Sequence, residues 1–270
     1  MGYQNLHTHT TYVDGEKAPE EMIKTAIEKG GTSIGFSEHA YIPFDKEYSM
    51  RVKDIPAYVK EINELKEKYK GIIDVFLGVE ADYYAEKVPA GLDYIIGVAH
   101  YIIKDGVIIT VDGPAERLYR MAAGHYDNDF YEIAESYYAT IAKSIVKSGA
   151  DIVGHFDLIA RNNDDGRMFD EKHPRYMSAA LDSMEQILKY CTLFEINTGG
   201  MYRRGVSTPY PSVLLLKELQ KRGGEVILSS DSHMADSLYY KFDEMRELVK
   251  SCGFKYIKRL TADGFVDEKL

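Results

Sequence analysis

The feature of this sequence that most constrains its fold is an alternation of short apolar runs with segments of helical spacing. The apolar runs predict strands at Tyr3–His7, Ser33–Ser37, Asp74–Glu80, Tyr94–His100, Asp151–His155, Leu193–Asn197 and Val226–Ser230. The segments between them predict helices at Ala18–Lys29, Pro56–Lys70, Asp127–Lys147, Tyr176–Tyr190, Pro211–Arg222 and Asp243–Lys250. Strands that alternate with helices form a parallel sheet. The 270 residues show no sign of two halves, so we expect one α/β domain over residues 1–270, an irregular barrel of seven strands.

The longest piece between clear elements is Lys104–Phe130, which carries several glycines and a proline. We interpret residues 104–130 as a hairpin or a long loop that leads into the next helix. Loops of this length often act as lids over active sites. A surface insertion without a function is an equal alternative.

Residue types that bind metals lie at the ends of six of the seven predicted strands. They are His7, His9, His39, Glu80, His100, His155, Asp231 and His233. The carboxyl ends of barrel strands share one face, which is where enzymes of this architecture have their sites. A single His at a strand end is more often a hydrogen-bonded structural residue. Their joint placement, however, predicts a metal site at the C-terminal ends of the strands.

The spacing of these residues suits metal binding. Residues i and i+2 of an extended chain point to the same side, so His7 and His9 can reach one ion, and Asp231 and His233 repeat that geometry. Glu80 can bridge two ions, and Asp14 is near enough in sequence to swing back. Mixed His and carboxylate ligands favour Zn²⁺, Mn²⁺ or Fe²⁺ over Ca²⁺ or Mg²⁺.

Net charge and cysteine content limit which partners and which cellular compartment we expect for this protein. The formal net charge of −10 is a poor match for nucleic acid, which needs an excess of Lys and Arg. Cys191 and Cys252 are far apart in the sequence, which favours a reducing cytoplasm over a disulfide framework. The N-terminus lacks the pattern of a signal peptide, and no apolar stretch is long enough to span a membrane. The oligomeric state cannot be predicted.

Five motifs, in order, resemble those of the PHP (polymerase and histidinol phosphatase) superfamily. They are His7-Thr8-His9-Thr10, Ser37-Glu38-His39, Gly78-Val79-Glu80, Gly154-His155-Phe156-Asp157-Leu158 and Ser230-Asp231-Ser232-His233. The resemblance covers nearly the whole chain and is greatest to the monofunctional histidinol-phosphatases. It implies a distorted (β/α)7 TIM-like barrel with a trinuclear centre of Zn, Mn or Fe.

The resemblance also implies roles for individual residues. One ion would take His7, His9, Glu80 and Asp231, a second would share Glu80 and take His100 and His155, and the third would take Asp14, His39 and His233. Some relatives have His where this chain has Asp14, which makes the third site the least secure. Val98-Ala99-His100 and Asn197-Thr198-Gly199-Gly200 depart from the family pattern but spare every proposed ligand.

The expected reaction is hydrolysis of a phosphomonoester, L-histidinol phosphate in histidine biosynthesis, by attack of a metal-bridging hydroxide. Arg161, with Arg203 or Arg204, would bind the phosphate bidentately. Asp231 or His233 would give a proton to the leaving alkoxide.

Four alternatives remain open. The chain could act on another small phosphate ester, act as a 3′-exonuclease, or bind metal without catalysis. An amidohydrolase-like deacetylase or deaminase also begins with His-x-His, but its later motifs fit this sequence less well.

Overall fold

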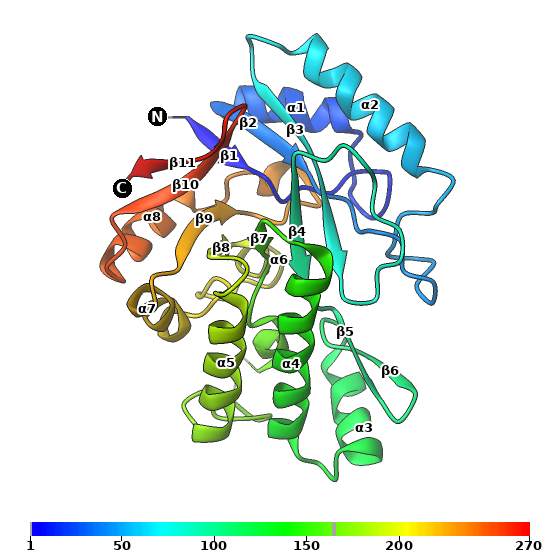
Figure 1. The fold of residues 1–270 in the computed structure, drawn as a ribbon, viewed down its shortest axis with the longest axis vertical. Coiled ribbons are helices and arrows are strands. Elements are labelled where there is room, and N and C mark those ends of the chain that lie inside the picture. The colour runs from blue at the N-terminus through cyan, green and yellow to red at the C-terminus, as the bar shows by residue number, and fades with distance from the viewer. Residues whose placement is uncertain (1, 164–165) are drawn as a thin grey trace.

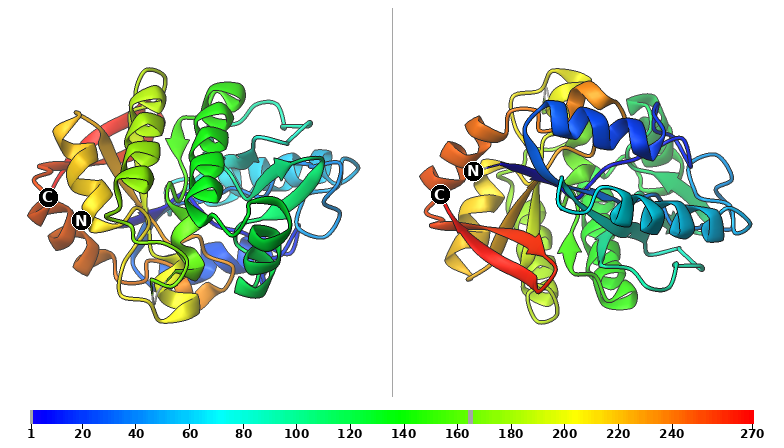
Figure 2. Two further views of the ribbon diagram at one scale, coloured as in Figure 1. Left: turned by 90° about the horizontal axis from the view of Figure 1, so that it is seen from below. Right: turned by 90° about the horizontal axis from the view of Figure 1, so that it is seen from above.

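The parallel strands curve into a nearly closed barrel in the computed structural model, which describes residues 2–163 and 166–270 (Figures 1 and 2). The strand order is β1 (Tyr3–Asn5), β2 (Gly31–Phe36), β3 (Asp74–Asp82), β4 (Tyr94–Val98), β7 (Ile152–Val153), β8 (Leu193–Asn197) and β9 (Glu225–Ser229). The first and last strands meet just beyond their ends. There the N–H of His9 donates to the carbonyl of Ser232 at 2.8 Å, and the N–H of Ser232 donates to the carbonyl of His7 at 3.0 Å. The expected distorted (β/α)7 barrel is therefore confirmed.

Helices cover the outside of the strands (Figures 1 and 2). The helices that follow the barrel strands are α1 (Pro19–Glu28), α2 (Ile55–Lys68), α4 (Phe130–Ser148), α5 (Pro174–Ile187), α7 (Val213–Lys221) and α8 (Phe242–Ser251). Local sequence sets their limits, as α4 shows. Asp129 accepts hydrogen bonds from the N–H groups of Tyr131 and Glu132, and Gly149 ends the helix at a φ of 63°. These are the capping residue types that helix ends favour. None of the helices in the described residues is long and apolar enough to cross a membrane.

Tyr94, the first residue of β4, fills the interior of the barrel below the carboxyl ends of the strands, that is, toward their amino ends. Its buried hydroxyl donates to the carbonyl of Leu6 and, at 3.1 Å, to that of Phe36. Glycines face the ring on the neighbouring strands: a Cβ built on Gly78 would lie 2.3 Å from Tyr94, and one on Gly35 would lie 2.4 Å away. The two glycines therefore make room for one large side chain, and the polar residues of the candidate site lie beyond it, at the carboxyl ends of the strands.

The segment between β4 and α4 is more ordered than the sequence predicted. The hairpin of β5 (Tyr101–Lys104) and β6 (Val107–Thr110) precedes a helix, α3 (Ala115–His125). The expectation of a hairpin is confirmed, but α3 was missed because its glycine-rich surroundings suggested a loop. In Figure 1, β5, β6 and α3 project together beside α4.

A second hairpin follows the last predicted helix. It consists of β10 (Tyr256–Thr261) and β11 (Gly264–Lys269) and lies beside β1 (Figure 1). The Gln4 side chain donates to the carbonyl of Leu260 at 2.9 Å and accepts from its N–H at 2.8 Å. Leu260 also packs in the same apolar cluster as Tyr94 and Ile96. The expectation that the regular elements end at Lys250 was therefore wrong.

Several predicted strands were too long at their carboxyl ends. β1 ends at Asn5, β4 ends at Val98 and β7 contains only Ile152 and Val153. His7, His100 and His155 consequently follow the strands instead of ending them. The regular ladder stops where the chain turns toward the barrel axis, and short connecting elements, α6 (Gly199–Arg204), η1 (Leu158–Asn162) and η2 (Ala235–Ser237), begin beyond these turns.

Candidate metal centre

Glu80 lies at the middle of a cluster of histidines at the carboxyl end of the barrel. It is the seventh residue of β3 and is 1% exposed. Its Oε2 lies 2.7 Å from Nδ1 of His39, and its Oε1 lies 3.0 Å from Nε2 of His155. Nε2 of His100 is 3.5 Å from Oε1. Five different strand ends therefore converge here, counting the end of β1 described next.

The loop after β1 supplies two imidazoles to this cluster. Nε2 of His7 lies 3.4 Å from Oε1 of Glu80 and 3.6 Å from Oδ1 of Asp231. Nε2 of His9 lies 3.6 Å from Oε2 of Glu80 and 3.4 Å from the same Asp231 oxygen. The two histidines thus stand side by side between the carboxylates of Glu80 and Asp231, as the His-x-His spacing predicted.

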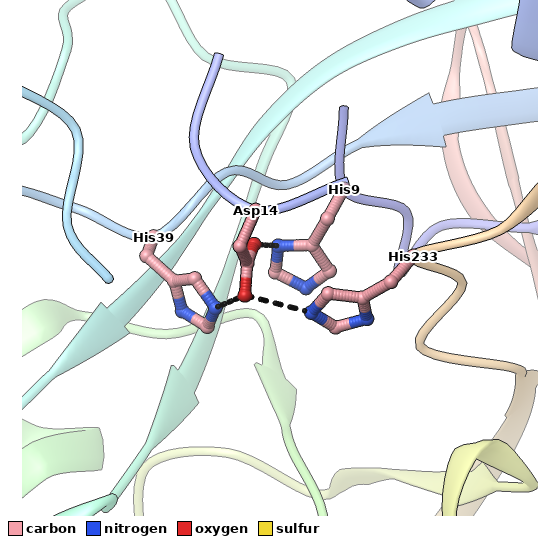
Figure 3. Close-up of side chains that lie close together, drawn as sticks. All are labelled: His9, Asp14, His39 and His233. Atoms are coloured by element: carbon pink, nitrogen blue, oxygen red, sulfur yellow. Dashed lines mark hydrogen bonds and ion pairs between the residues drawn. The ribbon is translucent and has the colours of Figure 1, made fainter. Parts of the chain in front are cut away.

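Asp14 swings back over the cluster, as Figure 3 shows. Its Oδ2 lies 3.1 Å from Nε2 of His233 and 3.6 Å from Nε2 of His39, and its Oδ1 lies 3.7 Å from Nδ1 of His9. The turn that carries it is held by the Thr10 carbonyl, which accepts from the N–H groups of Val13 and Gly15. Its placement brings together the three residues assigned to the third ion and adds His9.

Asp231 stands at the sharp turn after β9. Its φ of 45° lies in the left-handed region, which few residues other than glycine adopt. Arg203 fixes the turn by donating to the Asp231 carbonyl at 2.8 Å and to its Oδ2 at 2.9 Å. The same guanidinium lies 3.1 Å from Nδ1 of His233. A cation therefore holds Oδ2 of this carboxylate, while Oδ1 faces His7 and His9.

The sequence analysis missed one buried carboxylate, Glu195 of β8. Its oxygens lie 2.8 Å from Nδ1 of His7 and 2.6 Å from the N–H of His155, and they also accept from Ser229 and Asn197. A carboxylate bonded to the far nitrogen of a candidate ligand fixes the orientation and tautomer of that ring. The available signal was a Glu in the middle of an apolar strand, which is rarely buried without a partner.

Four overlapping groups in the described residues could each hold an ion. They are His7, His9 and Asp231; His7, Glu80 and His155; His39, Glu80 and His100; and His9, Asp14, His39 and His233. In each group, one ligand atom per residue lies within 4.8 Å of the others. Every candidate ligand from the sequence belongs to at least one group.

Several buried polar atoms in the cluster lack a hydrogen-bond partner within the described protein. They include Nε2 of His7, both ring nitrogens of His9, Oε2 of Glu80 and Oδ1 of Asp14. Leaving such atoms unpaired costs free energy, and imidazole and carboxylate atoms that converge without partners are the donor set of a site for borderline metals. The residues therefore fit divalent metal ions.

Electrostatics in the metal-free chain is dominated by burial and close charges. Burial lowers the pKa of His9 to about 3, with help from His233 and His39. Burial would also lower the pKa of His39, but Glu80 and Asp14 outweigh it and raise that pKa well above its usual value. Burial would raise the pKa of Asp231, but Arg203 and His7 hold it well below its usual value. The carboxylates are consequently ionised and can attract cations.

A cavity of about 610 Å³ opens over the cluster. Arg161 of η1 and Arg203 of α6 both line it, beside His233 and Asp231. Arg204 is not among its lining residues. Of the three arginines that the sequence analysis proposed as phosphate contacts, two therefore line the cavity and the third does not.

The fold and the donor cluster define a barrel protein with candidate sites for metal ions at the carboxyl ends of its strands. A model of the PHP domain matches residues 5–199, and the chain therefore belongs to the PHP domain family. A relative from Deinococcus radiodurans named "Probable histidinol-phosphatase" is 26% identical, over 93% of this chain and 94% of its own. The histidinol-phosphatase of Bacillus subtilis is 23% identical, over 92% of this chain and 99% of its own.

A solved structure is similar in fold. It is the histidinol phosphate phosphatase of Lactococcus lactis in complex with zinc, L-histidinol and phosphate, and it superposes with a TM-score of 0.65 at 21% identity. The superposition covers 97% of this chain and 98% of that one. It supports the same barrel for both chains.

Proposed function

We propose that this chain is a metal-dependent phosphomonoesterase that hydrolyses L-histidinol phosphate to L-histidinol and phosphate. The observation that carries the proposal is the convergence of six histidines and three carboxylates under one cavity, which Arg117, Arg161 and Arg203 also line. The family and the names of the relatives narrow the substrate to histidinol phosphate. The Lactococcus lactis structure, which contains L-histidinol and phosphate, supports that choice.

The donor set suits a trinuclear centre. His7, His9, Glu80 and Asp231 would hold one ion; Glu80, His100 and His155 a second; and Asp14, His39 and His233 a third. Zn, Mn and Fe all suit these ligands, and zinc is the metal in the Lactococcus lactis complex. When bound, such ions supply an activated water and positive charge for the phosphoryl oxygens.

Phosphoryl transfer depends on positioning and on neutralising charge at the phosphoryl oxygens. Arg161 lines the cavity with its side chain 30% exposed, and its ion pair among the described residues is a long one of 3.7 Å with Asp112, so its guanidinium is available to a phosphate. Arg203 also lines the cavity, but it is already bonded to Asp231. We assign Arg161 as the principal phosphate contact and Arg203 as a second contact that also holds Asp231.

The leaving alkoxide needs a proton. Asp231 and His233 both line the cavity. The bonds from Arg203 favour the ionised form of Asp231, so His233, whose side chain is 22% exposed, suits the role of proton donor better in a state in which it is not a ligand of the third ion. Asp231 then serves as a ligand and as an anchor for His9 and Arg203.

The small-molecule character of the substrate follows from the cavity and the charge. The cavity of about 610 Å³ is of a size for a small molecule, and the net charge of −10 would repel a polynucleotide. We propose the cytoplasm as the compartment, since both cysteines are free thiols and no disulfide joins them.

The test is phosphate release by metal-reconstituted protein from L-histidinol phosphate, sugar phosphates, nucleotides and single-stranded DNA, with and without a chelator. We expect strong preference for L-histidinol phosphate and complete loss with the chelator. Release from the other esters but not from L-histidinol phosphate would contradict the substrate assignment. Release from DNA would favour the exonuclease alternative. If all substrates remained intact, the chain would be a metal-binding protein without this activity.

A further inference from the structure

The cavity contains a carboxylate that the proposed catalytic machinery does not use. Six carboxylates line it: Asp14, Glu47, Glu80, Asp82, Asp112 and Asp231. Three belong to the donor cluster, and Asp82 accepts from the backbone N–H groups of Tyr84 and His100. Glu47 lies on an exposed loop at the rim. Asp112 remains, with its side chain 31% exposed inside the cavity wall.

The backbone holds Asp112 firmly in place. The N–H of Val111, on one side of it, donates to the carbonyl of His100 at 2.8 Å. The carbonyl of Gly113, on the other side, accepts from the Asn162 side chain at 2.8 Å. Asp112 is therefore tied to a candidate metal ligand and to the neighbour of Arg161. Groups fixed in this way can select a ligand without first being ordered.

The side chain of Asp112 is only loosely engaged. Its carboxylate lies 3.7 Å from Nη1 of Arg161, which is too far for a good hydrogen bond, and both side chains are about a third exposed. Ion pairs of this kind contribute little. A phosphate, in contrast, offers Arg161 two parallel hydrogen bonds. When Arg161 turns to a phosphate, Asp112 loses this ion pair, while the nearby Arg117 guanidinium in the same cavity wall is bonded to the Thr110 hydroxyl at 3.1 Å.

We propose that Asp112 binds the ammonium group of the substrate and so selects phosphate esters that carry an amine close to the ester. The inference rests on the proposed function, in which Arg161 binds the phosphate. The substrate would exchange one weak ion pair within the protein for two pairs across the interface. A phosphate ester without the amine would leave Asp112 buried beneath it without a partner, which is the basis of the discrimination.

The test compares wild-type protein with Asp112→Asn on two esters: L-histidinol phosphate, and the same ester with hydrogen in place of the amine. Assays at about pH 8 keep the imidazole, with an ordinary pKa of about 6.5, neutral. We expect Asp112→Asn to lower kcat/KM roughly 10- to 100-fold on the amine-bearing ester. On the deaminated ester it should leave kcat/KM within about twofold. Asp112→Ser is the second variant, so the result does not depend on the folding of one protein.

Asp105→Asn is the matched control. Asp105 is in the same insertion, at the turn between β5 and β6, and its φ of 52° is one that Asn adopts readily. It does not line the cavity, so both esters should react as with wild type. Equal losses on both esters in Asp112→Asn would show that Asp112 only positions Arg161 and would overturn the inference. Wild-type protein that hydrolyses neither ester would instead overturn the proposed function, and this inference with it.

Discussion

At the scale of the residue, the donor cluster depends on side chains that hold the candidate ligands as much as on the ligands. Glu195 is bonded to His7 and to the backbone of His155, and Arg203 is bonded to Asp231. Such supporting groups set ring orientation and keep carboxylates ionised. The candidate ligands themselves were predictable because they follow strands in recognisable motifs. The contact of Glu195 with His7 was not predictable, because the sequence of one strand does not show which residue of another strand lies opposite a buried acid.

Glu195→Gln tests this supporting role. The amide keeps the shape but cannot serve both His7 and the Ser229 hydroxyl as an acceptor with negative charge. We expect metal affinity to fall about 10- to 100-fold, measured by competition with a coloured chelator. Glu64→Gln, on the exposed face of α2 with its side chain 67% exposed, is the control and should bind as wild type. Wild-type affinity in Glu195→Gln would show that His7 is oriented by other contacts.

Protonation gives a second prediction at this scale. His ligands must be neutral to bind a metal. In the metal-free chain, burial opposes protonation of His100, but Glu80 and Asp82 raise its pKa to about 9. His100 is therefore protonated at neutral pH and must lose that proton on binding. We expect metal binding at about pH 7 to release protons and to tighten as pH rises toward 9, measured by calorimetry in buffers of different ionisation enthalpy. Binding without proton release would contradict the assignment of His100.

At the scale of the element, the barrel is completed by pieces that the alternation of strands and helices did not predict. The β10–β11 hairpin follows the last helix and bonds to β1 through Gln4 and Leu260. It was missed because a short hairpin at a chain end has no helix to mark it. The α3 helix was missed for a different reason: glycines and a proline surround it, and its stability comes from packing on the hairpin beside α4.

Leu260→Ala measures what the hairpin contributes. Leu260 is 5% exposed and packs in the apolar cluster that contains Tyr94 and Ile96. Removing its side chain there should lower the free energy of unfolding by about 2–4 kcal/mol, determined by urea denaturation of the metal-loaded protein. Val266→Ala, on the other strand of the hairpin and 42% exposed, should change it by less than about 0.5 kcal/mol. Equal effects would mean that the hairpin only covers the surface.

At the scale of the whole molecule, one architecture accounts for the position of the cavity. Parallel strands leave their carboxyl ends on one face. Tyr94 fills the barrel interior toward the amino ends of the strands, and the histidines and carboxylates lie at the carboxyl ends. The placement of the histidines and carboxylates on one face followed from the sequence, because strand ends and residue types are local properties. The packing of Tyr94 and the place of Asp112 in the cavity wall did not, since Asp112 lies beside Arg161 only when the insertion packs against η1.

The measurement that tests the central claim most directly is stepwise metal reconstitution of metal-free protein, with bound metal and phosphate release from L-histidinol phosphate measured on the same samples. We expect no release without metal and a rise in rate as ions bind. The rate should level off near three ions per chain, the number in the proposed trinuclear centre. Phosphate release that is the same with and without bound metal would contradict the account.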